Sequence, residues 1–500
     1  MSKRTQKFLH PIDRAASTLI LCLGVAIGSI AWAGNTCTGD CPLHAGPRVR
    51  EFSWEELTLR ADDTAFLLTF SRPMDRQSVE KNLTITPPLP GKVSWAGRTL
   101  AYTVDAPVPY GVNYKVQLKG AREQFANEEK AGIVMQPFEG TFKSRDRAFA
   151  YIGIEGEEQG RLILFNLTAD KKTVLTPPNL VVTDFKVYPD REDILFFAVD
   201  RRSGEFDLLE QRLYTVATGL GASQVADPEG VELAIDNRDY QNLQFDLSQD
   251  GKTIVVQRIN RQDPSDFGLW IQGEKGEIQP LGESPSGDFA IAPDSQTLVS
   301  STGEGMAVLP LDPQSEPIDF LPQFGKVLSF NQDGSAAAMV NFNRDDPKLR
   351  YVQSLYLVNN QGIQEKLLDV RGSIINCQFN PIGEKLYCLL AELIGEEQFI
   401  EQPYLTVVDL KTAEAQRVMT LPDYRDVQMS LAPDGLGLLF DRVIVDPNFD
   451  RNSPLRTNSG DAIASSRLWF LLTPISLDDP DNQPQLEELP LNGLRPRWLP

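Results

Sequence analysis

A short turn motif recurs between residues 188 and 436, and an apolar run follows most copies. The clearest copy is Ala432-Pro433-Asp434-Gly435, followed by residues 436–440 with the sequence LGLLF. Proline presets φ at the second turn position, aspartate suits the third, and glycine takes the positive φ that follows. An apolar run of this length has no polar face, which is typical of a strand covered on both sides by other sheets. The motif therefore predicts repeated strand-turn-strand units that pack face to face.

The spacing of the copies predicts the size of the repeating unit. The second turn positions, which we call the anchors, are Pro189, Gln249, Pro293, Gln332, Pro381 and Pro433. They are separated by roughly 40 to 60 residues, the length of one four-stranded propeller blade. The last seven residues, LRPRWLP, look like the first strand of a further copy, and residues 148–153 look like its second strand. We therefore expect an all-β ring of seven blades in residues 147–500, closed by pairing of these two strands, which leaves no exposed sheet edge.

The repeats resemble those of a known family. The turn, its apolar strand and the later sequences LYTV at 213–216 and LYLV at 355–358 resemble the WD-repeat-like β-propeller repeats of TolB-type proteins. The resemblance covers residues 148–500. It implies a binding platform, and platforms of this kind carry many functions.

The N-terminus predicts export. Four basic residues and one acidic residue within positions 3–14 precede an uncharged apolar run over residues 15–33, which ends in Ala31-Trp32-Ala33. We expect residues 1–33 to be a cleaved signal peptide or an uncleaved membrane anchor, and residues 34–50 to be a linker. Either outcome places the remaining chain in the periplasm or at the cell surface, with membrane contact only through residues 15–33.

The cysteines suggest one disulfide. Cys37 and Cys41 lie just after the export segment, so an oxidising compartment favours a small disulfide ring between them. Cys377 and Cys388 flank the turn at residues 380–383. If Asn380 faces residue 384, these two cysteines fall on opposite faces of the hairpin, and we expect both to be buried and unpaired.

Residues 51–146 predict a separate β-sandwich. Phe66, Leu68 and Phe70 alternate on one face of a strand, and residues 92–104 form a hairpin about Ala96-Gly97. The sequence FSRPMD at 70–75, with residues 78–79 and 85–87, resembles the bacterial Ig-like domain of S-layer and other surface proteins. The resemblance implies a spacer or adhesive module.

Several kinds of chemistry are excluded from the predicted domains. The two histidines, His10 and His44, lie outside both domains, which excludes a Ser-His-Asp triad and histidine-held catalytic metals there. Neither a G-x-S-x-G elbow nor a P-loop sequence is present. The net charge of −21 argues against nucleic acid as a partner. We therefore expect no cofactor and no enzymatic activity.

The long loops after the second strand of each blade contain the candidate binding residues. Arg201, Arg261 and Arg344 each follow an anchor by twelve residues. They either ring the mouth of the channel and bind a carboxylate or phosphate, or they pair with nearby acids such as Asp263 and Asp346. The longest loop, residues 443–466, contains Asp446 and Asp450 and is either a calcium site or a flexible acidic loop.

Together these features predict an exported, non-catalytic binding or scaffolding protein. The long-loop face of the propeller would bind an envelope or surface protein. The alternative is an envelope enzyme that acts on a glycan through carboxylates at the channel mouth, because glycosidases need only two well-placed acids.

Overall fold

The computed structural model describes residues 23, 25, 46–124, 132–201, 208–221, 225–282, 287–395, 400–421, 426–446, 455–457, 460–473 and 484–500. Nearly all of the predicted export segment, the Cys37 and Cys41 pair and Asp450 therefore lie outside the described residues. Within the described part, no helix is long and apolar enough to cross a membrane.

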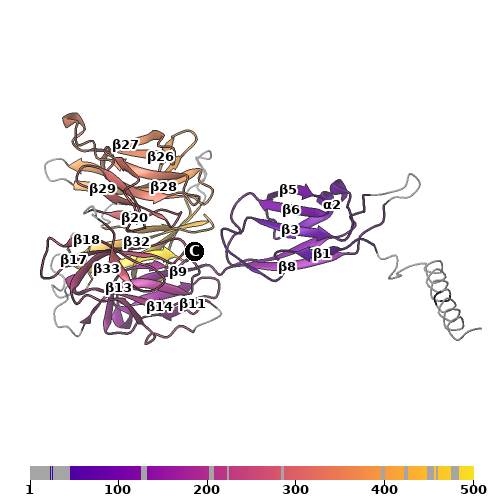
Figure 1. Cartoon of the computed structure of the whole chain (residues 1–500), viewed down its shortest axis with the longest axis horizontal. Coiled ribbons are helices and arrows are strands. Elements are labelled where there is room, and N and C mark those ends of the chain that lie inside the picture. Colours follow the sequence, from indigo (N-terminus) through magenta and orange to yellow (C-terminus); the bar gives the residue numbers. More distant parts are fainter. Residues whose placement is uncertain are drawn as a thin grey trace, which may run out of the picture. The chain divides into compact units, whose positions relative to one another are not determined.

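The chain divides into two compact units. The first contains Met1–Leu57, Ala65–Thr103 and Asn113–Phe142, and the second contains Thr58–Thr64, Val104–Val112 and Lys143–Pro500. Both are built from strands, which agrees with the predicted all-β class (Figure 1).

Two four-stranded sheets contain the strands between residues 49 and 144. The first has the order β1-β3-β6-β5 and the second β2-β8-β7-β4. Their bounds are β1 Val49–Phe52, β2 Thr58–Leu59, β3 Ala65–Phe70, β4 Leu83–Thr86, β5 Gly91–Ala96, β6 Thr99–Val104, β7 Asn113–Leu118 and β8 Phe138–Ser144. The predicted alternation in β3 is present, since Phe66, Leu68 and Phe70 are fully buried. A short helix, α2 (Arg76–Asn82), follows β3 and is capped by the Asp75 carboxylate.

The second unit consists of antiparallel sheets, five with four strands and one with seven, and we call each run of four strands a blade. Blade 2 contains β12 (Leu180–Val187), β13 (Asp193–Asp200), β14 (Arg212–Ala217) and β15 (Glu232–Ile235). Blade 3 contains β16 (Tyr240–Leu247), β17 (Ile254–Asn260), β18 (Phe267–Gln272) and β19 (Ile278–Pro280). Blade 4 contains β20 (Phe289–Ile291), β21 (Thr297–Ser301), β22 (Met306–Pro310) and β23 (Asp319–Leu321).

Blades 5 and 6 share one long strand, β27 (Gln364–Phe379). Blade 5 also contains β24 (Lys326–Phe330), β25 (Ala336–Asn341) and β26 (Val352–Asn359), and blade 6 contains β28 (Lys385–Gly395), β29 (Ile400–Asp409) and β30 (Ala415–Thr420). The strand changes sheets at Gly372, which has a φ of 138°. A Cβ at this glycine would lie 2.1 Å from the carbonyl oxygen of Ala391, so a larger residue does not fit.

The last strand returns to the beginning of the second unit. Blade 7 contains β31 (Met429–Leu431), β32 (Gly437–Val445), β33 (Ile463–Leu472) and β34 (Leu486–Glu488). Blade 1 is formed by β9 (Ala148–Gly153), β10 (Leu162–Asn166), β11 (Lys171–Val174) and β35 (Gly493–Trp498). The predicted pairing is confirmed, because β35 pairs antiparallel with β9, and the yellow C-terminal residues lie beside β9 in Figure 1.

The turn motif adopts the predicted backbone. Gly251, Gly334, Gly383 and Gly435, two residues after their anchors, have φ values between 69° and 74°. At the same position, Arg191 and Ser295 also have positive φ, so the turn is formed there without glycine. The backbone conformation of the turn is therefore the same in copies whose residues differ.

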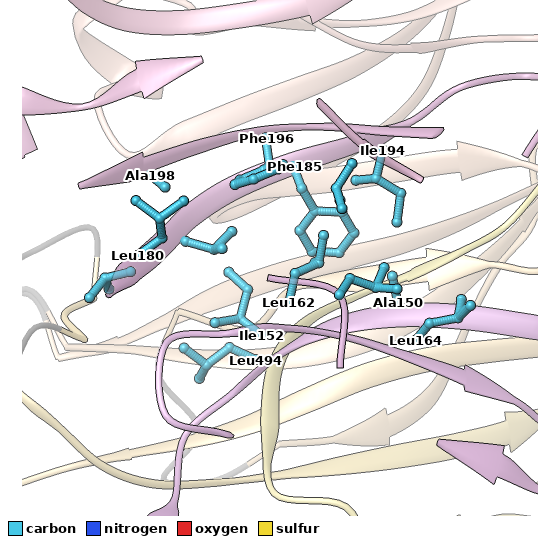
Figure 2. Packing of buried hydrophobic residues seen from close by; sticks show 14 of the residues in the cluster. Ala150, Ile152, Leu162, Leu164, Leu180, Phe185, Ile194, Phe196, Ala198 and Leu494 are labelled. Carbon is cyan, nitrogen blue, oxygen red and sulfur yellow. The ribbon is translucent and has the colours of Figure 1, made fainter. Parts of the chain in front are cut away.

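Apolar side chains fill the spaces between neighbouring blades. Figure 2 shows Ile152 and Leu162 of blade 1 packed beside Phe185 and Phe196 of blade 2, all of them buried. Leu494 of β35 belongs to the same cluster. β35 therefore contributes to the core as well as to the hydrogen bonding of blade 1.

The prediction that Cys377 and Cys388 are unpaired is wrong. The two residues lie directly opposite one another on β27 and β28 and form a disulfide. The amide of Asn380 donates to the carbonyl of Lys385, so Asn380 faces residue 385 rather than 384. This one-residue shift moves both cysteines to the same face of the hairpin.

Candidate functional site

The three loop arginines share one structural role. The Arg201 guanidinium donates to the carbonyl of Gln159 in blade 1, Arg261 donates to the carbonyl of Leu209 in blade 2, and Arg344 donates to that of Gly303 in blade 4. Each arginine follows the second strand of its own blade and reaches the corresponding loop of the preceding blade. The predicted register is therefore present, and these residues act as clasps between neighbouring loops.

Arg261 makes the most extensive of these contacts. Its two terminal nitrogens lie 2.8 Å and 3.1 Å from the two carboxylate oxygens of Glu210, in η3 (Leu208–Glu210). Its Nε donates to the carbonyl of Asn237 at 2.8 Å. Among the described residues, Arg344 donates one hydrogen bond, of 3.3 Å to Gly303, and it packs over the ring of Phe342.

The predicted acidic partners bind elsewhere. Asp263 accepts hydrogen bonds from Ser265, and Asp346 accepts one from the amide of Lys348 at the start of η4 (Pro347–Leu349). Asp446 lies at the end of the described part of its loop. Within the described residues, no group of three His, Cys, Asp or Glu side chains lies close enough to hold a metal ion.

A second set of polar residues lies on the first strands of the blades, directly before the turn motif. Because side chains alternate along a strand, residues three and five positions before an anchor share one face. Three positions before the anchors, with Pro500 as the last anchor, stand Lys186, Asp246, Ala290, Ser329, Gln378, Ser430 and Arg497. Five positions before them stand Asp184, Gln244, Asp288, Val327, Asn376, Gln428 and Arg495.

Many of these residues line one cavity of about 360 Å³, which we call the first-strand cavity. It is bounded by residues of β12, β27, β31 and β35 and of the chain next to them. Its polar lining consists of Lys186, Asn376, Gln378, Gln428, Ser430, Arg495 and Arg497. The cavity is therefore formed by strands from both ends of the second unit.

The cations of the cavity and the carboxylates that pair with them lie on blades 1, 2 and 3. Arg497 Nη2 is 2.9 Å from the carboxylate of Asp184, and Arg495 Nη1 is 3.6 Å from the same oxygen. Lys186 forms an ion pair with Asp246, which is buried. Burial raises the pKa of Asp184, but Arg497, Arg495 and Lys186 outweigh this effect, so that its pKa lies below the usual value. The three cations line the cavity, whereas Asp184 and Asp246 are not among its lining residues.

Polar side chains also join three of the first strands to the first strand of the next blade. The Asp246 carboxylate accepts the amide of Ile291 on β20 at 2.9 Å, and the Gln378 side chain accepts that of Leu431 on β31 at 2.8 Å. Ser430 accepts the amide of Trp498 on β35 at 3.1 Å. Some of these side chains are therefore already committed to holding the strands together.

Bulges interrupt the pairing of five first strands. The register shifts near Val182, Asn242, Val327, Ile374 and Leu494. A bulge turns the side chains that follow it relative to the sheet. In β35 the bulge includes Arg495, whose φ is 50°.

Asp441 holds the backbone of two residues that line the cavity. This residue of β32 is almost fully buried, and its two carboxylate oxygens accept the amides of Gln428 and Arg495, each at 2.7 Å. Burial, opposed by these hydrogen bonds, raises its pKa to about 7. Both oxygens are engaged by backbone, so Asp441 acts on the cavity only through the two residues that it holds.

Sequence reasoning did not identify this cavity. The basic and acidic residues of the first strands are scattered over more than 300 positions, from Asp184 to Arg497. They form a set only when the copies are superimposed on their anchors. The turn motif gives that alignment, so the signal was present in the sequence.

Comparisons with known proteins show similarity of fold. No protein-family model matches the chain, and no curated protein does either. Among solved structures, an oligogalacturonate lyase from Vibrio parahaemolyticus has 14% identity and a TM-score of 0.43, with 59% of this chain and 87% of that chain covered. TolB from Acinetobacter baumannii has 10% identity and a TM-score of 0.42, with 84% and 83% covered. A putative 6-phosphogluconolactonase from Bacteroides fragilis has 13% identity and a TM-score of 0.43, with 71% and 97% covered.

These matches correct one prediction. We expected no enzymatic activity from a chain with these repeats. That expectation is wrong, because the solved structures that resemble the chain include ones named as enzymes as well as TolB. A fold of this type does not exclude catalysis.

Proposed function

We propose that the second unit is a closed seven-bladed propeller that takes a carboxylated carbohydrate into the first-strand cavity and acts on it there. We further propose that the chain is exported to the periplasm or cell surface, where such a glycan would be met. The sandwich, which we assign to the Ig-like type, would serve as a spacer.

The observation that carries this proposal is the excess of cations in the cavity. Arg495, Arg497 and Lys186 line the cavity, and none of its lining residues in the described part of the chain is an aspartate or glutamate, although the net charge of the chain is −21. Arginine binds carboxylates through two parallel hydrogen bonds, which gives both affinity and orientation. The side-chain amides of Asn376 and Gln428 and the hydroxyl of Ser430 are suited to the hydroxyl groups of a sugar.

The same residues support proton transfer beside the bound carboxylate. Neutralisation of a carboxylate by arginine makes removal of a proton from the adjacent carbon easier. Asp184 is held ionised by the arginines in the free protein. A ligand carboxylate that engages Arg495 and Arg497 would weaken their hold on Asp184, which would raise the pKa of Asp184 and make it a stronger base. We assign Asp184 as the general base. It would take the proton from the carbon beside the carboxylate, the electron pair of that C–H bond would form a C=C bond, and the glycosidic oxygen on the next carbon would leave and take a proton from water.

Binding can be tested by calorimetry with an oligomer of galacturonic acid and the matching oligomer of uncharged galactose. We expect the acidic oligomer to bind and the neutral one to bind at least about tenfold more weakly. Arg497→Gln should lose about tenfold or more in affinity. The matched control is Arg417→Gln. It removes an arginine of β30, the outer strand of blade 6, that forms an ion pair with Glu392. Equal binding of both oligomers would contradict the proposal.

Catalysis is tested separately with Asp184→Asn. This variant should retain binding of the acidic oligomer and lose its turnover, followed by mass spectrometry of the sugar products over time. A variant that turns the oligomer over at the wild-type rate would exclude Asp184 as the base.

The loop face supports a second candidate function, the binding of an envelope protein. The clasps made by Arg201, Arg261 and Arg344 hold neighbouring loops together before any partner arrives, and a preorganised surface binds at a lower entropic cost. Asp263, Asp346 and Asp446 would present carboxylates on the same face. Crosslinking in intact cells from positions next to these acids should recover a recurrent protein partner.

A further inference from the structure

We propose that Asp441 is the positioning residue of the first-strand cavity and that it couples closure of the ring to ligand binding. This inference rests on the proposed function, since it concerns the same cavity. Under this proposal, Asp441 does not contact the ligand. It fixes the backbone of two residues that line the cavity.

The geometry places Asp441 at the seam between blades 7 and 1. Gln428 directly precedes β31, the first strand of blade 7, and Arg495 belongs to β35, the closing strand of blade 1. One oxygen of Asp441 accepts the Gln428 amide and the other accepts the Arg495 amide. Both of these residues line the cavity.

Arg495 needs such support because its backbone is unfavourable. Its φ of 50° lies in the left-handed region, which costs a non-glycine residue free energy. It also lies in the bulge where the pairing of β35 with β9 is interrupted, so the sheet does not hold its amide. The Asp441 carboxylate holds that amide instead, and the Arg495 side chain is then directed toward Asp184.

The free-energy cost of burying the Asp441 carboxylate also indicates a role beyond stability. A buried carboxylate loses its hydration, and a neutral residue of similar shape would avoid that loss. Asparagine has one oxygen in place of two, so it can accept only one of the two amides. A carboxylate is the side chain of this size that can hold both strands at once.

The test is a double-mutant cycle on binding of the galacturonic acid oligomer, with Asp441→Asn, Arg495→Gln and the double variant. If Asp441 acts through Arg495, each single change should weaken binding about tenfold, and the double variant should bind no more weakly than the weaker single variant. Losses that multiply in the double variant would overturn the inference.

A second measurement does not depend on the ligand. In protein labelled with ¹⁵N at arginine and glutamine, the amide signals of Arg495 and Gln428 should titrate together with one common midpoint as Asp441 takes up a proton. The charged groups that act on Asp441 are Asp426, which precedes β31, and Arg495 itself. Independent midpoints for the two amides would overturn the inference even if Asp441→Asn fails to fold.

The two proposals fail in different ways. If Arg495→Gln and Arg497→Gln both bind the oligomer as the wild type does, the proposed function is wrong, and the amide titration still decides the role of Asp441. If both arginine variants lose binding but Asp441→Asn binds normally, the positioning role is wrong and the proposed function stands.

Discussion

At the scale of single residues, the loop arginines differ in how much they should stabilise the fold. Arg261 donates to both oxygens of Glu210 and to two backbone carbonyls, and its side chain is 26% exposed. Arg261→Ala should lower the free energy of unfolding by about 1–3 kcal/mol, because these partners lose a charged donor. Arg344→Ala removes one long hydrogen bond and should cost less than about 1 kcal/mol. Urea unfolding of both variants measures the difference, and equal losses would contradict the assignment of Arg261 as the stronger clasp.

Asp441 should make stability depend on pH in a defined direction. Its pKa is about 7 in the folded chain, against an ordinary value of 3.8. Between these values the folded state holds a proton that the unfolded state has released, so this group's contribution is present at pH 4 and is lost as the pH rises through 7. The stability of the wild type relative to Asp441→Asn should therefore fall from pH 4 to pH 8. A difference that rises over this range would contradict the raised pKa.

The residues of the candidate site were predicted only in part. The common register of Arg201, Arg261 and Arg344 follows from counting along the chain, and the structure shows equivalent contacts for all three. Their partners could not be predicted, because each lies on the preceding blade, between about 40 and 52 residues away. The first-strand residues were missed for a different reason: each blade carries only one or two of them.

At the scale of elements, the disulfide in blade 6 should stabilise the hairpin that carries part of the cavity. Both cysteines are fully buried, and the bond closes a loop with a sequence separation of 11. Replacing both by alanine should cost about 3 kcal/mol by the loop-entropy relation. Thermal unfolding of this double variant measures the loss, and Cys37→Ala with Cys41→Ala serves as the control. Trypsin cleaves after Lys385, between the two cysteines, so non-reducing peptide mapping shows directly whether they are bonded.

The strands were more predictable than the way they pair. The turn motif determines where strands begin, because the positive φ after it recurs even at Arg191 and Ser295. The pairing at the cysteines was predicted wrongly because that prediction set Asn380 opposite residue 384. In all six copies the residue before the anchor donates to the carbonyl five positions later, as Asn380 does to Lys385. β27 passes from blade 5 to blade 6 at Gly372. No sequence pattern at this glycine predicts the change of sheet.

At the scale of the whole second unit, the strongest prediction concerns the last strand, β35. β35 pairs with β9, contributes Leu494 to the core of blades 1 and 2, and supplies both arginines of the cavity. A chain that ends at Asn492 would expose the edge of β9, where Phe149 and Tyr151 are now fully buried. We expect it to unfold at a lower temperature and to self-associate, because an unpaired apolar edge strand pairs with other chains.

The proposed closure of the ring and the proposed binding of the ligand can then be separated by adding the missing strand as a peptide. A peptide of residues 493–500 should restore both the unfolding temperature and binding of the galacturonic acid oligomer to the shortened chain. The same peptide with Arg495→Gln and Arg497→Gln keeps Leu494 and Trp498, so it should restore the unfolding temperature without restoring binding. If the shortened chain is monomeric and as stable as the full chain, β35 does not close the ring. If the arginine-free peptide restores binding as well, the cations that select the ligand lie on other strands.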